Sequence, residues 1–154
     1  MPFSKHPPQR QRAIFDDGAV DRAEAKLRAL SVEFEEWMAE EVEKVHAARN
    51  EARADAWTDA AFERLFAASH DAKGLGATYE YPLITELAAS LCRLLETDEN
   101  KAAARSRLPL IDAHVDAMRA AARDKIKTPD HPVGKVLLRE LTRQVDGLGL
   151  AVMF

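Results

Sequence analysis

Residues 82–96 read PLITELAASLCRLLE. Apolar residues recur there at spacings of three and four, which is the period of one face of an α-helix. Proline is well tolerated at the first position of a helix, so Pro82 marks where this helix begins. The segment therefore predicts an amphipathic helix that buries one broad face, over Leu83, Ile84, Leu87, Ala88, Leu91, Cys92, Leu94 and Leu95.

The same spacing recurs on both sides of this segment. It predicts further helices from Val20 to about residue 48, from Thr58 or Asp59 to about 79, from Pro109 to about 126, and from Val133 to Gly147. The polar run 49–55 is expected to connect two helices, and residues 101–107 are ambiguous. No segment alternates like a strand. We expect an all-α protein, an antiparallel up-down four-helix bundle with an additional C-terminal helix.

Composition narrows the class of protein. The 154 residues carry a formal net charge of −4, whereas nucleic-acid binding calls for a dense basic surface. Cys92 has no second cysteine to pair with, and no apolar run approaches the length of a membrane span. We expect a cytoplasmic protein that binds neither nucleic acid nor membrane. The proline-rich residues 1–18 are expected to form a flexible arm, and 19–154 one helical domain.

The candidate site lies in residues 70–76, which read HDAKGLG. Phe62, Ser69 and Gly76 define the buried stripe of the predicted helix, and His70 falls about 120° from the centre of that stripe. Four residues with mostly small side chains share the outward sector with His70: Glu63, Ala67, Gly74 and Ala77. Lys73 lies between this sector and the buried stripe. The pattern predicts an exposed imidazole that another protein can approach closely.

The chemistry available to this site is nucleophilic. An exposed imidazole is largely neutral near pH 7, so one ring nitrogen of His70 keeps a lone pair. The Lys73 ammonium could offset the charge of an arriving phosphoryl group. Gly74 costs about 1 kcal/mol of helix stability relative to alanine, and close approach of a partner would give a reason for that cost. The alternative is an ordinary surface histidine, with Gly74 and Gly76 serving helix packing.

A family resemblance adds to this interpretation. Residues 66–96, FAASHDAKGLGATYEYPLITELAASLCRLLE, resemble the histidine-containing phosphotransfer (Hpt) domain of two-component phosphorelays, especially stand-alone alphaproteobacterial members. The matching features are His-x-x-Lys-Gly, the small residues that follow it, and the leucine-rich helix ending in Leu-Glu. These features cover about a fifth of the chain. The family usually has glycine ten residues after the histidine, where this chain has Glu80.

The resemblance implies a phosphorelay intermediate. His70 would accept a phosphoryl group from a receiver-domain aspartate of a response regulator and pass it to another receiver. Lys73 would be the charge partner of the phosphoryl group, and Gly74 would provide clearance. Such domains carry no cofactor, because the receiver supplies Mg²⁺, and they have no ATP-dependent kinase activity. The implied partners are receiver domains and a hybrid histidine kinase.

Two other functions stay open. The chain could be a non-phosphorylated adaptor that binds a receiver or kinase through the same face, or a helical dimerisation module related to histidine kinases. We expect a monomer, because the heptad pattern of the first helix is short and Glu41 interrupts it. No metal site is expected, because Glu43 and His46 form only one of the two Glu-x-x-His pairs that a di-iron bundle uses. His114 is expected to be a half-buried packing residue.

Overall fold

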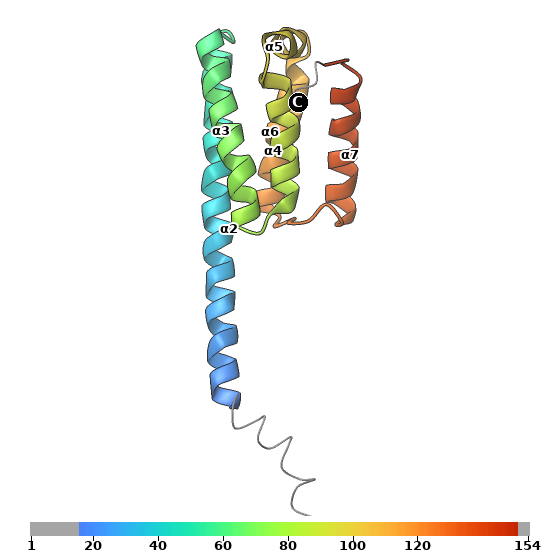
Figure 1. The fold of residues 1–154 in the computed structure, drawn as a ribbon. Helices are drawn as coiled ribbons and strands as arrows, with labels where there is room; N and C mark the ends of the chain where they lie inside the picture. The colour runs from blue at the N-terminus through green and yellow to red at the C-terminus, as the bar shows by residue number, and fades with distance from the viewer. Residues whose placement is uncertain (1–15, 151–154) are drawn as a thin grey trace, which may run out of the picture. The chain divides into compact units, whose positions relative to one another are not determined.

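The computed structural model describes residues 16–150, and these are helical throughout apart from short connections (Figure 1). Six helices follow one another, and this part of the chain has no strand. They are α2 (Asp17–Ala54), α3 (Asp59–Thr78), α4 (Pro82–Leu95), α5 (Asp98–Arg105), α6 (Leu108–Arg123) and α7 (Pro132–Asp146). The predicted all-α class is confirmed for these residues.

The chain divides into two units, residues 1–34 and 35–154. The expected boundary after residue 18 stays a prediction. Helix α2 already begins at Asp17, so the last two residues assigned to the arm are helical. Residues 1–15 of the expected arm lie outside the described residues. The second unit holds the candidate site.

Capping residues explain where several helices begin. The Thr58 side chain accepts a hydrogen bond from the Ala61 amide, and the Thr97 side chain accepts one from the Asn100 amide. Each bond satisfies one of the amides that the first turn of a helix leaves without a partner. Pro82 opens α4, where its missing N–H costs nothing. The predicted starts of α3 and α4 are confirmed.

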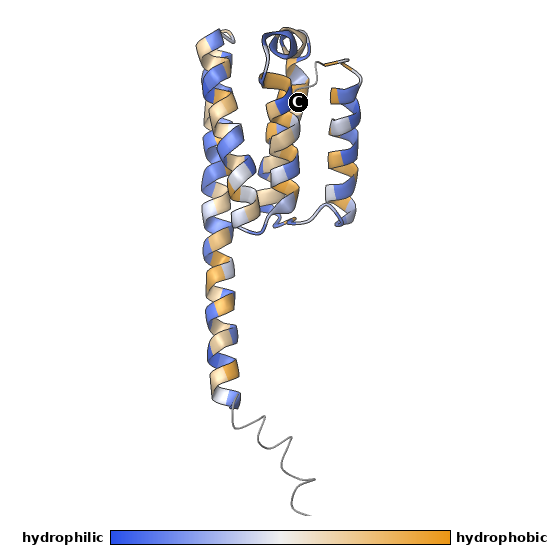
Figure 2. Cartoon of the chain, in the orientation of Figure 1, coloured by the Kyte–Doolittle hydropathy of each residue, from blue (hydrophilic) through white to orange (hydrophobic). Residues whose placement is uncertain are grey.

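Helix α4 is the centre of the second unit. It packs against α3, α5, α6 and α7, and Figure 2 shows that many of its residues are apolar. Gly76 allows α3 to approach it closely, since an added Cβ there would lie 2.9 Å from the Thr85 backbone nitrogen. The largest side chains of the core are fully buried: Tyr81, Phe62, Met38, Leu65, Leu83, Ile84, Leu87, Leu91, Leu94, Ile111 and Met118.

The predicted connection at residues 49–55 is wrong for most of its length. Helix α2 continues to Ala54, and Arg49 is only 5% exposed. The Arg49 guanidinium donates a hydrogen bond of 3.0 Å to the Asp112 carboxylate on α6. Polarity at this position therefore reflects an ion pair between two helices rather than a solvated loop.

A membrane-spanning helix must be both long and apolar, and the helices of residues 16–150 do not meet this requirement.

Candidate functional site

His70 is exposed on the outer side of α3. The predicted stripe beneath it is confirmed, because Phe62, Ser69 and Gly76 are all buried. The ring of Phe66 lies one helical turn before the imidazole, with 6.0 Å between the ring centroids. Within residues 16–150, no hydrogen bond engages either ring nitrogen of His70. The structure therefore leaves the imidazole accessible.

The neighbours of His70 on the same helix face leave space around it. Glu63, Ala67, Gly74 and Ala77 are all exposed, as the spacing predicts. A Cβ added at Gly74 would meet no atom of residues 16–150 within 4 Å. At Gly76 an added Cβ would instead collide with α4. Packing of α3 against α4 therefore explains why residue 76 is glycine. Packing among the described residues does not explain why residue 74 is glycine.

Lys73 lies at the edge of this face, where α3 meets α4. Its side chain is half-buried, and its backbone carbonyl accepts a hydrogen bond of 2.9 Å from the Thr85 hydroxyl. Burial raises the pKa of the Cys92 thiol on α4 to about 11, and the positive charge of Lys73 opposes part of that rise. The charge of the Lys73 ammonium is therefore felt at α4, on one side of the candidate site. Cys92 is protonated at neutral pH and poorly suited to nucleophilic chemistry.

A surface pocket of about 460 Å³ adjoins His70 on the side of α2. Residues of α3, including Asp71 and Gly74, form one wall, and Glu41 and Lys44 of α2 form the other. The Lys44 ammonium donates a hydrogen bond of 2.8 Å to the Glu41 carboxylate, which raises the pKa of Lys44. Lys44 therefore lines the same pocket as His70.

Sequence reasoning did not find the pocket residues on α2. Glu41 and Lys44 are far from His70 in sequence, and a surface Glu–Lys pair at a spacing of three is common on any exposed helix. Only the packing of α2 against α3 brings this pair to the imidazole. No pattern in the sequence could have singled it out.

His114 is fully buried rather than half-buried. Its Nδ1 lies 2.7 Å from the Leu110 carbonyl oxygen, and its Nε2 lies 2.8 Å from the Ser90 hydroxyl. A carbonyl only accepts, so Nδ1 carries the proton and Nε2 accepts from Ser90 in the neutral ring. Burial lowers the pKa of His114, and the bond to the Leu110 carbonyl opposes part of that effect. Its ring nitrogens are therefore inaccessible to a partner.

The two remaining described histidines are engaged locally. His46 contacts the Arg49 guanidinium through Nδ1 at 3.0 Å and the Asn50 amide through Nε2 at 3.2 Å. His131 accepts a hydrogen bond of 3.1 Å from the Val133 amide at the start of α7. Glu43, the residue paired with His46 in sequence, accepts a hydrogen bond from Arg119. Residues 16–150 contain no group of three side chains that could hold a metal ion.

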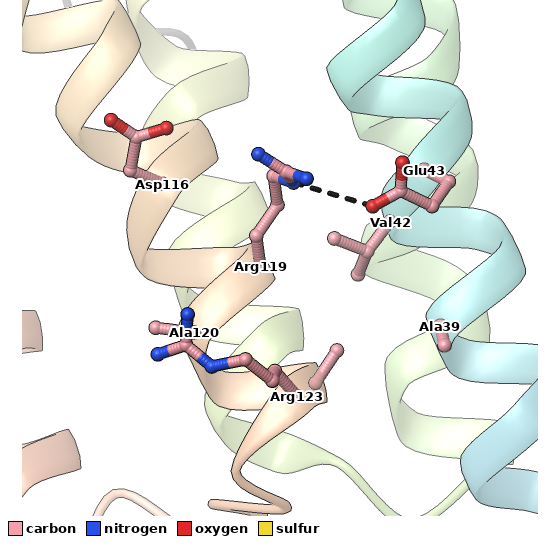
Figure 3. Close-up of a pocket in the computed structure, with 8 residues that line it drawn as sticks. Ala39, Val42, Glu43, Asp116, Arg119, Ala120 and Arg123 are labelled. Carbon is pink, nitrogen blue, oxygen red and sulfur yellow. Dashed lines mark hydrogen bonds and ion pairs between the residues drawn. The ribbon is translucent and has the colours of Figure 1, made fainter.

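A second pocket, of about 410 Å³, lies between α2 and α6 (Figure 3). Ala39 and Val42 form part of its wall, and an ion pair of 3.3 Å between Arg119 and Glu43 spans it. Its charged side chains are of both signs. No histidine is among the described residues that line it, and its Glu43 carboxylate is already paired with Arg119.

The turn between α3 and α4 has a strained residue. Glu80 has a φ of 65°, in the left-handed region that glycine adopts at no steric cost. This is the position at which the sequence departs from the pattern of the phosphotransfer family. The backbone there adopts the conformation that favours glycine, although the side chain is that of glutamate.

Comparison of the chain with protein-family models, with curated proteins and with solved structures gives no match.

Proposed function

We propose that this chain is a phosphorelay intermediate of the histidine phosphotransfer type, with His70 as the phosphoryl acceptor. The observation that carries the proposal is the combination of an accessible imidazole and a neighbouring glycine that packing does not require. A partner whose own active site must reach the imidazole needs that clearance. The left-handed backbone of Glu80 is compatible with the glycine that the family usually has there, although Ala56, Trp57 and Lys125 adopt the same conformation after other helices.

The proposed fold is an antiparallel four-helix bundle of α2, α3, α4 and α6, with α7 as the additional C-terminal helix. Packing of α4 against α3, α6 and α7 is compatible with this arrangement. The bundle would hold α3 rigid, which matters because transfer between two proteins depends on the positions of the reacting atoms. We propose a cytoplasmic location, where receiver domains act.

The proposed reaction is a reversible phosphoryl transfer. The lone pair of the unprotonated His70 nitrogen forms the N–P bond, the P–O bond to the receiver aspartate breaks, and the aspartate leaves as a carboxylate. The proton on the other ring nitrogen passes to water, because the ring is exposed. A second receiver aspartate reverses these steps. The receiver supplies Mg²⁺, and this chain supplies the nucleophile and a lysine ammonium that offsets negative charge.

Two lysines are candidates for that ammonium. The family resemblance assigns the role to Lys73, which lies on the α4 side of the site. Lys44 shares the pocket of His70 on the α2 side, although Glu41 neutralises part of its charge. Either lysine could offset the charge of the phosphoryl group in this proposal, Lys73 from the α4 side or Lys44 from the α2 side. We propose no ATP-dependent kinase activity for this chain.

The experiment is transfer of ³²P from phosphorylated receiver domains of the source organism. We expect the wild-type protein to acquire alkali-stable, acid-labile label, as a phosphohistidine would, and His70→Gln to acquire none. His131→Gln is the matched control, because His131 is also exposed but lies at the start of α7. Binding of a receiver without transfer of label would favour the adaptor instead. Label on His70→Gln equal to that on wild type would contradict the proposal.

A further inference from the structure

The first unit of the chain presents an apolar stripe to solvent. Residues 17–34 form the N-terminal part of α2, and Figure 2 shows apolar bands recurring along it. Val20 is 39% exposed, Leu30 is 41% exposed and Leu27 is 65% exposed. Single exposed apolar residues are ordinary, but a row of them on one helix face marks an interaction surface.

The spacing of this stripe identifies the kind of surface. Val20, Ala23, Leu27 and Leu30 follow one another at alternating intervals of three and four residues, and Phe34, which is partly buried, continues the spacing. That is the a/d pattern by which two helices pack as a coiled coil. We propose that this stripe docks against the same stripe of a second copy of the chain, with the two helices antiparallel.

The charges beside the stripe fix the direction and register. Lys26 and Glu33 both occupy g positions, which flank the seam of a coiled coil. In an antiparallel pair with Leu27 opposite Leu30 of the second copy, Lys26 lies beside Glu33 of that copy. Because side chains lean towards the N-terminus of their helix, the two groups converge. The two-fold axis repeats the pair, so the surface is complementary to itself.

Other arrangements lose this complementarity. In a parallel pair, Lys26 lies beside Ser31 of the second copy, and no cation lies beside Glu33. Shifting the antiparallel register by one heptad places Lys26 beside Lys26 in one direction, and Glu33 beside Glu33 in the other. Like charges at these positions oppose pairing. The antiparallel register centred between Leu27 and Leu30 is the one that the charges favour.

This inference replaces the expectation of a monomer. We expected a monomer because the heptad pattern of the first helix is short and is interrupted at Glu41. An antiparallel contact centred between Leu27 and Leu30 does not require the pattern to reach Glu41. Because the contact is short, we expect a reversible dimer that is half-formed on the order of 100 µM. The inference does not depend on the proposed function.

Sedimentation velocity across a concentration series tests the contact. We expect wild type to dimerise as concentration rises and Leu27→Glu to remain monomeric. Val32→Glu is the matched control, because Val32 is 52% exposed on the same helical segment but lies off the stripe. Circular dichroism would verify that both variants keep the helix content of wild type. A wild-type protein that stays monomeric at about 1 mM, or equal effects of the two substitutions, would overturn the inference.

Charge reversal tests the register. Lys26→Glu and Glu33→Lys should each weaken dimerisation about tenfold, because each places like charges together twice. The double variant restores opposite charges across the antiparallel contact and should dimerise like wild type. In a parallel dimer residues 26 and 33 do not meet, so the second substitution would not rescue the first. Failure of that rescue would overturn the antiparallel arrangement.

Discussion

Gly74 lies one turn after His70 on α3, and an added methyl group there would meet no atom of the described residues within 4 Å. Glycine in a helix costs free energy because its backbone loses more freedom on folding than that of any other residue. The space beside this glycine means that packing among residues 16–150 does not offset the cost. A partner that approaches the imidazole would offset it.

Two substitutions at Gly74 separate stability from binding. Gly74→Ala should raise the free energy of unfolding by about 1 kcal/mol, measured by urea denaturation. Gly74→Trp should fold but raise the KM for a phosphorylated receiver about tenfold or more, because the indole occupies the approach to His70. Ala113→Trp, at an exposed position on α6, is the control for adding a bulky side chain. If Gly74→Trp transfers phosphate as fast as wild type, the clearance interpretation is wrong.

At the scale of helices, local signals predicted some boundaries and missed others. Thr58 and Pro82 mark the starts of α3 and α4 because capping and the geometry of proline act within one turn. The end of α2 was missed because Arg49 looks like a loop residue until its partner on α6 is known. Helix α5 was ambiguous because it spans only Asp98–Arg105 and its residues are largely polar.

The turn between α3 and α4 gives a prediction at the same scale. Glu80→Gly should stabilise the protein by about 1 kcal/mol, because it removes the steric cost of a left-handed backbone from a residue with a Cβ. Thermal unfolding would measure the gain. Glu86→Gly, at an exposed position within α4, is the control and should destabilise the protein instead. A loss of stability in Glu80→Gly would mean that the glutamate side chain contributes more than the strain costs.

At the scale of the whole molecule, the core and the site differ in how far the sequence predicts them. The buried stripe of α3 and the exposure of His70 follow from helical periodicity alone. The pocket beside His70 does not, because Glu41 and Lys44 reach it only through the packing of α2 against α3. The burial of His114 was underestimated because the depth of a helix face depends on which neighbours cover it.

The buried His114 links α6 to α4 and makes the stability of the whole molecule depend on pH. Burial lowers the pKa of His114 in the folded state, whereas in the unfolded chain it is about 6.5. Below that value the unfolded state binds a proton that the folded state does not, so stability falls as the pH decreases. The contribution is complete above about pH 6.5 and declines by up to about 1.4 kcal/mol per pH unit below it.

Urea unfolding at pH values from about 7.5 to about 5 would measure this dependence. His114→Gln should have a flatter profile than wild type over this range, because glutamine has no proton to bind. His131→Gln is the control, since the ring of His131 is exposed. Profiles of wild type and His114→Gln that run parallel would show that the buried histidine does not titrate on unfolding.

The central claim is that the bare imidazole on α3 carries the phosphoryl group. Its most direct measurement is mass spectrometry of the protein after reaction with a phosphorylated receiver, under conditions that preserve N–P bonds. The account predicts one phosphoryl group, located on His70 and absent from Glu63, Lys73 and the other histidines. A phosphoryl group on any other residue, or a protein that stays unmodified with every receiver of its organism, would contradict it.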